Sequence, residues 1–364
     1  MIVKRFKSFT VKAVAGANVT TVVVMWAIGF SYCVNPIAHP VISSLGLFFP
    51  IFLALNILFL FFWLVFKWKM AAIPLLGFLV AYQPVHTYIP VNPRQDSIPP
   101  KALKVLSFNV KGYCGTDFDT DKQEVANQLK DYVRNIDADI VCLQEDLQDG
   151  EKRFPGNLYP YSQVVVVGQS KQNAVGIYTH YPILRTESID YSSAGNGSVA
   201  FYLKIKSDTV IVINNHLEST HLSLDERQRY KEMLKGGMNR QKARSESKRL
   251  ISRLAQSVKM RAPQADSVHQ YILSHSQYPL IVCGDFNDNP ISYARHTIAK
   301  GLTDCYVATG FGLGLSYNQK GFYVRIDNLM CSAHFKPYNC KVDNKIDISD
   351  HYPIICWLEK RDKP

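Results

Sequence analysis

A run of 54 residues from Ala13 to Phe66, without a single Asp, Glu, Lys or Arg, is the strongest constraint on how this 364-residue chain can fold. A membrane-spanning helix needs only about 20 apolar residues, so the run is long enough for two such helices. We place the spans near residues 13–34 and 41–66, because NPIAHP at 35–40 puts two prolines between them. The sequence therefore predicts an integral membrane protein.

A second uncharged stretch, residues 70–93, follows Lys67 and Lys69. Its first part, MAAIPLLGFLVAY, is apolar, whereas QPVHTYIPV is polar and interrupted by proline. We predict a third span near residues 70–91, with an interfacial or re-entrant segment as the alternative. A cleavable signal peptide fits poorly, because such a peptide has one short apolar region.

Basic residues predict the orientation of these spans. Two clusters flank them, Lys4, Arg5, Lys7 and Lys12 before the first span and Lys67 and Lys69 after the second. Both clusters are expected to stay in the cytoplasm. Three spans then place everything after residue 95 on the non-cytoplasmic side, whereas two spans would leave it in the cytoplasm.

The formal net charge of +11 is unevenly distributed. Residues 227–261 alone contain twelve basic and two acidic residues, and the body of the chain after residue 95 is otherwise mildly acidic. This pattern argues against a globally basic nucleic-acid-binding protein. The basic segment could hold a polyanion or an anionic membrane surface. Alternatively, it is a solvated helical insertion with Leu250, Leu254 and Val258 facing the protein.

The proline-rich PVNPRQDSIPPK at 90–101 is predicted to link a transmembrane region, residues 1–89, to a domain at residues 102–364. In that domain, runs rich in Val, Ile, Tyr and Phe predict strands at 103–110, 138–145, 161–168, 174–179, 199–205, 209–217, 279–287, 323–332 and 350–358. Amphipathic helices such as VANQLKDYVRNI at 125–136 lie between them. We expect an α/β domain that stays folded and soluble without residues 1–94.

Polar residues gather where these strands begin or end. In IVCGDFNDNP at 281–290, apolar residues and a glycine run directly into carboxylates and amides. One such ending is unremarkable, since Asx-rich strand ends are common and a lone Glu or His there is usually solvated. The pattern recurs, however, in six segments: LSFN with Asn109, VCLQE with Glu145, INNHLES with His216, VCGDFN with Asp285 and Asn287, RIDNL with Asp327, and SDHYP with Asp350 and His351. Carboxylate and amide oxygens suit Mg²⁺ or Mn²⁺.

The ordered set LSFNV, IVCLQE, NNHLE, GDFND, RIDNL and SDHYPI resembles the endonuclease/exonuclease/phosphatase superfamily, the DNase I-like metal-dependent phosphohydrolases. The resemblance covers residues 103–358 and leaves the membrane segment outside. It implies a four-layer α/β sandwich, in which two packed β-sheets carry helices on their outer faces and the site lies at one sheet edge. It also implies Glu145 as the principal Mg²⁺ ligand, Asn109 as its neighbour and Asp350 as a further ligand.

The resemblance implies catalytic roles for the other residues. His351 would be the general base that activates water, with Asp327 accepting its second N–H. Asp285 and Asn287 would orient the nucleophile and hold a phosphate oxygen. His216 would be a candidate acid for the leaving oxygen.

Reaction type follows from such a resemblance much better than substrate does. We expect a membrane-anchored, Mg²⁺-dependent phosphodiesterase, with Mn²⁺ as a possible substitute metal. Nucleic acid and phospholipid both stay open as substrates, and the second would make the protein a phospholipase C-like or sphingomyelinase-like enzyme. A catalytically silent membrane binding module is a further alternative, against which the complete residue set argues. No feature of the sequence predicts a protein partner.

Overall fold

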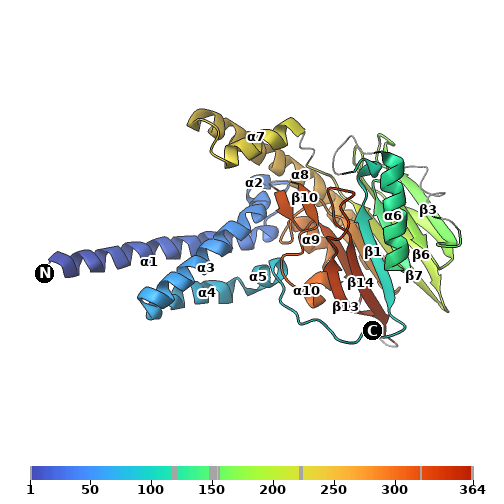
Figure 1. Cartoon of the computed structure of the whole chain (residues 1–364), viewed down its shortest axis with the longest axis horizontal. Helices are drawn as coiled ribbons and strands as arrows, with labels where there is room; N and C mark the ends of the chain where they lie inside the picture. The colour runs from blue at the N-terminus through green and yellow to red at the C-terminus, as the bar shows by residue number, and fades with distance from the viewer. Residues whose placement is uncertain are drawn as a thin grey trace.

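The computed structural model describes residues 2–115, 121–146, 154, 156–220, 224–319 and 322–361. It has two parts, a helical arm formed by residues 2–88 and a body formed by the residues from 103 onward. The arm projects from one end of the body, and the N-terminus lies at its far tip (Figure 1).

The arm contains α1 (Ile2–Gly29), η1 (Ser31–Cys33), α2 (Pro40–Ser43), η2 (Ser44–Phe48), α3 (Phe49–Phe66), η3 (Trp68–Ala71), α4 (Ala72–Val80) and α5 (Tyr82–Tyr88). Two helical segments of the described chain, Phe9–Gly29 and Pro40–Phe66, are long and apolar enough to cross a membrane. The third predicted span is broken, because Trp68–Val80 and Tyr82–Tyr88 meet at an angle of 73°. The arm therefore has two such helices, or three spans if the bent pair counts as one.

The helices of the arm run back and forth along its length. Helix α1 leads toward the body, α3 leads away from it, and α4 and α5 return (Figure 1). The indole Nε1 of Trp26 in α1 donates a 2.8 Å hydrogen bond to the carbonyl oxygen of Gly77 in α4. Ala81, at the end of α4, is fully buried in one cluster with Met25 and with Phe49, the first residue of α3. The returning segment thus reaches the level at which α3 began.

The body contains two six-stranded sheets. The first has the order β13-β14-β1-β2-β4-β3, with β1 (Leu103–Asn109), β2 (Ile140–Gln144), β3 (Tyr161–Val167), β4 (Asn173–Thr179), β13 (Phe335–Val342) and β14 (Ile354–Lys360). The second has the order β5-β6-β7-β8-β12-β9, with β5 (Ile183–Ile189), β6 (Gly197–Ile205), β7 (Asp208–His216), β8 (Leu280–Asp285), β9 (Thr303–Asp304) and β12 (Asp327–Cys331). A short ribbon pairs β10 (Tyr317–Gln319) with β11 (Phe322–Val324).

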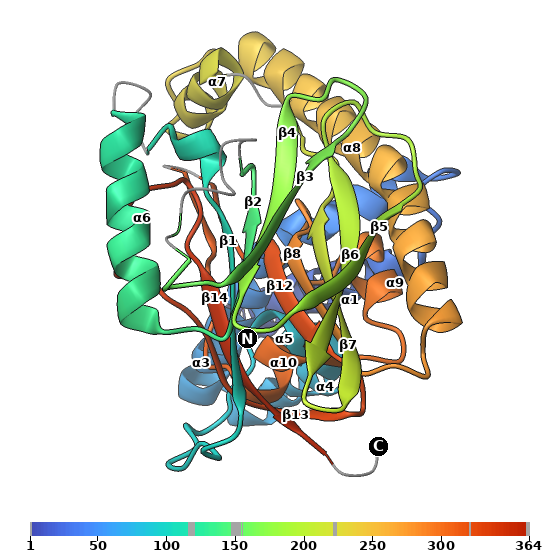
Figure 2. The ribbon, with the colours of Figure 1, turned by 90° about the vertical axis from the view of Figure 1, so that its right-hand side faces the viewer.

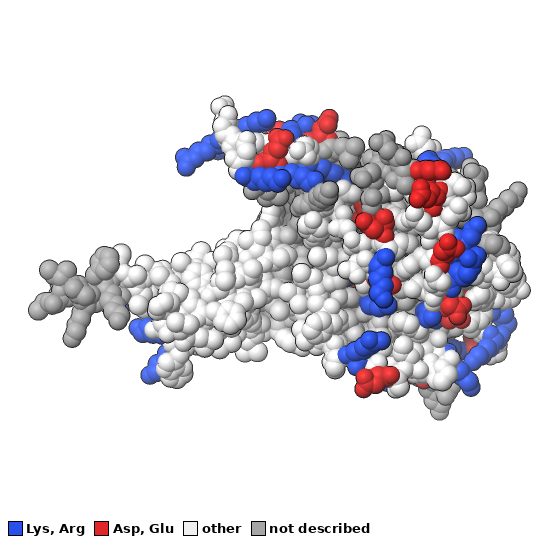
Figure 3. Space-filling view, in the orientation of Figure 1, with Lys and Arg blue, Asp and Glu red and all other residues white. Residues whose placement is uncertain are grey.

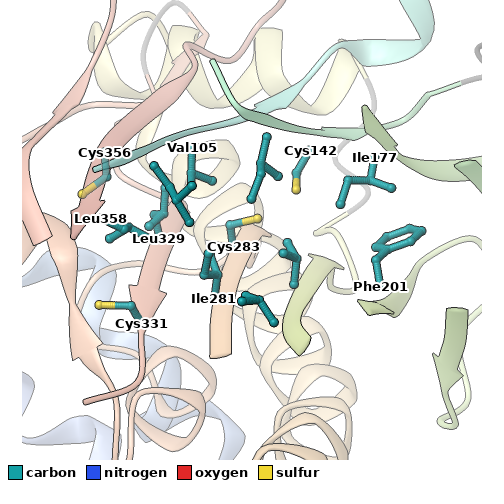
Figure 4. Close-up of a cluster of buried hydrophobic side chains, with 14 of the residues drawn as sticks. Val105, Cys142, Ile177, Phe201, Ile281, Cys283, Leu329, Cys331, Cys356 and Leu358 are labelled. Atoms are coloured by element: carbon teal, nitrogen blue, oxygen red, sulfur yellow. The ribbon is translucent and has the colours of Figure 1, made fainter. Parts of the chain in front are cut away.

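The sheets pack face to face, and helices cover their outer faces. Side chains such as Val105 and Ile177 of the first sheet meet Phe201 and Leu329 of the second in a buried core (Figure 4). Helix α6 (Lys122–Ile136) packs its apolar face on the first sheet. Helices α8 (Arg240–Ser274) and α9 (Tyr293–Ile298) cover the second (Figure 2). The predicted four-layer α/β sandwich is confirmed.

Several element boundaries differ from the sequence prediction. The last strand begins only at Ile354, and the run at 323–332 divides into β11 and β12. Strands β5 and β13 were not predicted, and both lie at the edge of a sheet. Edge strands tolerate exposed polar residues and proline, and β13 contains Pro337, so neither strand shows a clear apolar signal. The basic segment forms part of α7 (Leu224–Leu234) and most of α8.

Hydrogen bonds join the arm to the body. The buried guanidinium of Arg325 donates to the carbonyl oxygens of Thr87 and Tyr88 at the end of α5. In the predicted linker, the amide nitrogen of Asn92 lies 3.3 Å from the carbonyl oxygen of Gly310, which accepts its hydrogen bond. The proposed domain boundaries stay a prediction, but Thr87, Tyr88 and Asn92 are hydrogen-bonded to the body.

Candidate active site

The strand registers bring the predicted polar residues to one end of both sheets. In the second sheet, His216 at the end of β7 pairs with Asp285 at the end of β8, and Asp285 pairs with Asp327 at the start of β12. In the first sheet, Asn109 at the end of β1 pairs with Gln144, the residue before Glu145. Because the sheets pack face to face, these two rows of side chains meet.

Two of the predicted site residues have left-handed backbones. Glu145 follows β2 with φ of 54°, and Asn287 follows β8 with φ of 52°. Residues other than glycine rarely adopt this conformation, and it is enriched at functional sites. Gly284 is needed for a different reason, because an added Cβ would lie 2.0 Å from the carbonyl oxygen of Asn215. These backbone conformations lie next to Glu145 and Asp285, at the strand ends where the two sheets bring the polar side chains together.

Asn109 connects two carboxylates that come from different sheets. Its amide Nδ2 donates 3.0 Å hydrogen bonds to Oε1 of Glu145 and to Oδ2 of Asp285. The Glu145 side chain is 35% exposed, whereas that of Asp285 is 1% exposed. Burial raises the pKa of Asp285 to about 7, although nearby His351 acts in the opposite direction. One carboxylate of the pair is therefore open to the cleft and the other is enclosed.

His351 and Asp327 form a buried pair beside these carboxylates. Nδ1 of His351 lies 2.9 Å from Oδ2 of Asp327, and Nε2 lies 3.6 Å from Oδ2 of Asp285. Burial favours the neutral imidazole, but Asp327 and Asp285 outweigh it and raise the pKa of His351 to about 10. The hydroxyl of Ser316 accepts the backbone N–H of Asp327 at 3.0 Å, which fixes the start of β12.

His216 approaches the same carboxylates from the other side. Its Nε2 lies 3.7 Å from Oε1 of Glu145 and 3.8 Å from Oδ2 of Asp285. Nδ1 lies 3.2 Å from the amide nitrogen of Asn173, a residue that the sequence analysis did not single out. A lone Asn at the start of a strand carries no signal of its own. Burial lowers the pKa of His216, so its imidazole is neutral near pH 7.

Asp350 and Asn287 lie at the border of this group. Oδ2 of Asp350 is 3.9 Å from the Arg227 guanidinium, and the Asn287 amide donates to the carbonyl oxygen of Leu217 at 2.9 Å. Arg227 was predicted only as part of the basic segment. Its guanidinium also lies 5.9 Å from the ring centroid of Tyr317, and that ring contacts His351. No sequence signal pointed to Tyr317.

Together these residues surround a cleft of about 630 Å³. It is lined by Glu145, Asp285, Asn287, Asp350 and His351, and by Lys111 and Arg227 among the basic residues. A second groove of about 420 Å³ is lined by Glu145, Asn173 and His216. Glu145 therefore lies where the two depressions meet.

The donor set fits a hard divalent cation. Asp285, Asp327 and His351 offer ligand atoms that lie within 4.8 Å of one another. Within the described chain, Oδ1 of Asp327 and Nε2 of His216 are buried without a hydrogen-bond partner. Glu145 adds a carboxylate oxygen of the kind that Mg²⁺ and Mn²⁺ prefer, whereas Asn109 turns its amide nitrogen to the carboxylates and its Oδ1 accepts the backbone N–H of Lys111. Which of these atoms would bind the ion stays a prediction.

Comparison with solved structures finds proteins with the same fold as the body. An endonuclease/exonuclease/phosphatase family protein from Bacteroides thetaiotaomicron aligns over 74% of this chain and 98% of its own, with 17% identity and a TM-score of 0.53. A mannosyl-6-phosphatase from the same species aligns over 71% and 99%, with 17% identity and a TM-score of 0.51. Human Nocturnin, whose catalytic domain was solved with bound sulfate, aligns over 74% and 97%, with 14% identity and a TM-score of 0.51. These likenesses establish the fold.

Sequence comparison separates the arm from the body. No curated protein is significantly similar to the chain in sequence. Residues 11–88 match a domain of unknown function, DUF8431, and residues 106–351 match the endonuclease/exonuclease/phosphatase family. The second match covers more than half of the chain and includes all eight predicted site residues. The chain therefore belongs to the endonuclease/exonuclease/phosphatase family of phosphoester hydrolases.

Proposed function

We propose that this protein is a membrane-anchored, Mg²⁺-dependent phosphodiesterase. The observation that carries the proposal is the position of His351. Its Nδ1 is held by Asp327 at 2.9 Å, while its Nε2 faces the carboxylates at the head of the cleft. Without a metal ion the surrounding carboxylates raise the pKa of His351 and keep its imidazole protonated near pH 7. A cation bound to these carboxylates would offset their charge and lower that pKa, so that Nε2 could take a proton from a water molecule beside a bound phosphoester.

Glu145 is the proposed principal metal ligand, because its carboxylate opens to the cleft. Asn109 stays the proposed neighbouring ligand and would bind through Oδ1, which here accepts the backbone N–H of Lys111. Asp350 stays a proposed further ligand, since it lines the same cleft and its Arg227 contact is longer than a hydrogen bond. Mn²⁺ would serve the same oxygen ligands. The bound cation would supply the positive charge that neutralises the phosphate oxygens and stabilises the leaving oxygen.

The proposed reaction is a simple hydrolysis. His351 accepts a proton from water, whose oxygen forms a new bond to phosphorus as the ester P–O bond breaks. Asp285 and Asn287 orient the water and a phosphate oxygen. Since the Asn173 amide donates to Nδ1 of His216, Nε2 carries the hydrogen and can donate it toward the leaving oxygen. No serine or cysteine nucleophile is needed.

The path of the arm supports a non-cytoplasmic position for the body. The bent pair α4 and α5 returns to the level at which α3 starts, so the chain would traverse the membrane an odd number of times. Lys67 and Lys69 lie at the end of the arm away from the body, where the positive-inside rule expects cytoplasm. Both observations favour the three-span topology.

Hydrolysis of bis-p-nitrophenyl phosphate by the full-length protein in detergent tests the proposed activity. We expect release of p-nitrophenol with Mg²⁺ or Mn²⁺ and its loss with EDTA, restored by excess metal. Asp131→Asn on the exposed face of α6 is a matched control that should behave as wild type. EDTA-resistant activity would contradict the metal mechanism. If the protein hydrolyses neither this substrate nor DNA, RNA, phospholipids or inositol phosphates, the proposal that it is a phosphodiesterase is wrong.

A further inference from the structure

Part of the wall of the active-site cleft belongs to the arm. Ser44 and Leu47 of η2 line the same cleft as Glu145 and His351. The contact is close, because a Cβ added to Gly46 would lie 2.8 Å from Oδ1 of Asn289, in the loop that follows β8. The membrane region is therefore packed against the loop that carries Asp285 and Asn287, and it is not a remote tether.

This wall lies at the end of a membrane-spanning helix. The candidate span Pro40–Phe66 includes η2, and α3 begins at Phe49, two residues after Leu47. The body-side end of a span lies in the interfacial layer of a bilayer, where lipid headgroups and their phosphates are found. The cleft would therefore open at the headgroup level and lead from there to His351.

The lining of the cleft changes character along its length. Near the arm it carries apolar side chains, with Leu47 of η2, Leu254 and Val258 of α8, Val324 of β11 and Ile326, together with the polar Ser44 and Asn289 and the Arg261–Asp288 ion pair. Under the alternative of a solvated helical insertion, Leu250, Leu254 and Val258 were predicted to face the protein; Leu254 and Val258 line this cleft, and Leu250 is not part of its lining. Beyond Glu145 the second groove is polar, with Ser170, Asn173, Asn196 and His216 in its lining. The catalytic residues thus separate an apolar compartment from a polar one.

Positive charge surrounds the apolar compartment. Arg227 of α7 lines the cleft, and its guanidinium lies 3.9 Å from the Asp350 carboxylate. Lys and Arg side chains, with some acidic ones among them, also gather along α7 and α8, across from the largely apolar arm (Figure 3). Such a surface attracts anionic headgroups at the membrane.

From these observations we infer that the substrate is a membrane phospholipid, which enters the cleft from the bilayer. Its apolar part would lie against Leu47 and Leu254, its phosphodiester between His351 and His216, and its polar headgroup in the groove beyond Glu145. This inference rests on the proposed phosphodiesterase activity and adds the class of substrate. A soluble phosphoester or a nucleic acid would use neither the apolar compartment nor its position at the membrane.

Matched pairs of substrates that differ only in their acyl chains test the inference. The full-length protein with Mg²⁺ would be given phosphatidylglycerol, phosphatidylinositol or phosphatidylcholine in mixed micelles, and the deacylated glycerophosphodiester of each. Phosphorus NMR identifies the product and the bond broken. We expect kcat/KM to be at least about tenfold higher for one acylated member than for its deacylated partner, the scale of discrimination by apolar pockets.

Substitutions of Leu47 and Leu254 test whether the apolar end of the cleft binds the acyl chains of the substrate. Leu47→Gln and Leu254→Gln should each lower the ratio of phospholipid to bis-p-nitrophenyl phosphate hydrolysis by roughly tenfold. Leu184→Gln, on an exposed edge strand outside the cleft, should leave that ratio unchanged. Equal or faster hydrolysis of every deacylated partner, faster cleavage of single-stranded DNA or RNA, or an unchanged ratio in both variants would overturn the inference. In those cases bis-p-nitrophenyl phosphate would still be hydrolysed, whereas failure of the proposed function would abolish that activity too.

Discussion

The arm and the body distribute polar and apolar side chains in opposite ways. In the arm, Phe61 and Val65 of α3 are 61% and 77% exposed, whereas the amides of Asn18 and Asn56 are fully buried against each other. In the body, the sheets enclose an apolar core, and charged residues cover the surface. Burial of apolar area drives folding in water, but it cannot hold helices together in lipid, where interhelical hydrogen bonds and close packing take over.

The arm and the body share a buried apolar cluster where they meet. Ile291, which follows the GDFNDNP loop of the body, packs in the buried cluster of the arm with Met25 and Phe49. The ring centroid of Tyr32 in η1 lies 4.3 Å from that of His296 in α9. The α/β body is thus packed directly against helices that are long and apolar enough to cross a membrane, and the candidate active-site cleft has lining residues from both parts.

The largest expected effect is the side of the membrane on which the body lies. Alkaline phosphatase fused after Pro364 should be active in a bacterial host, and green fluorescent protein at the same position should not fluoresce, because three crossings would end on the side of the membrane opposite to the N-terminus. A fusion at Lys67 is the control and should give the reverse pattern. Fluorescence after Pro364 would mean that only two segments cross.

Loss of the base should have the next largest effect. His351→Ala is expected to lower kcat by about 10²-fold to 10⁴-fold, the range of general-base catalysis, and added Mg²⁺ should not restore it. Mg²⁺ affinity, measured by calorimetry, should stay close to that of wild type. Asp327→Asn should produce a milder loss of rate, because it disturbs the orientation of the imidazole without removing the base. A near-wild-type rate for His351→Ala would exclude this assignment.

Loss of the ligand should have a different signature. Glu145→Gln removes a charge from the proposed metal site, so the Mg²⁺ concentration needed for half-maximal activity should rise about tenfold or more. Excess Mg²⁺ should then recover part of the rate, which separates this variant from His351→Ala. Metal titration of the hydrolysis rate measures the shift. If Glu145→Gln binds Mg²⁺ as tightly as wild type, another residue holds the metal.

Removing the arm should lower the thermal stability of the body without preventing it from folding. A chain lacking residues 1–94 is expected to fold, because both sheets lie beyond residue 103. Its Tm should fall by roughly 5–15 °C, since buried Arg325 loses the carbonyl oxygens of Thr87 and Tyr88. Calorimetry compares it with the full-length protein in the same detergent. Aggregation of the truncated chain alone would show that the body depends on the arm to fold.

The smallest expected effect lies inside the arm. Asn56→Leu removes the acceptor that Asn18 and Thr21 use, at 3.0 and 3.1 Å. Interhelical hydrogen bonds in membranes are worth about 1 kcal/mol, so unfolding in detergent should begin at slightly lower denaturant concentration. Leu58→Val on the exposed face of α3 is the control. An unchanged midpoint would show that packing alone holds α1 against α3.

Much of the active site was predictable because residue types report chemistry directly. Asn109, Glu145, His216, Asp285, Asp327 and His351 were each identified by a polar strand end, and the structure brings all six together. Asn173 and Tyr317 were missed, because each contacts a histidine that is far away in the sequence. Their importance depends on a neighbour that only folding supplies.

The sequence by itself determined that the chain has an uncharged, membrane-compatible stretch at residues 13–66 and an α/β region after residue 102, since hydropathy and strand periodicity are local properties. It also determined which side chains could carry out phosphoester chemistry. Only the tertiary structure decided that the third predicted span is a bent pair of helices, and that Leu47 of the arm forms a wall of the cleft. Such contacts join segments more than 200 residues apart, for example Gly46 and Asn289. They arise from close packing in three dimensions, which no local pattern of residues encodes.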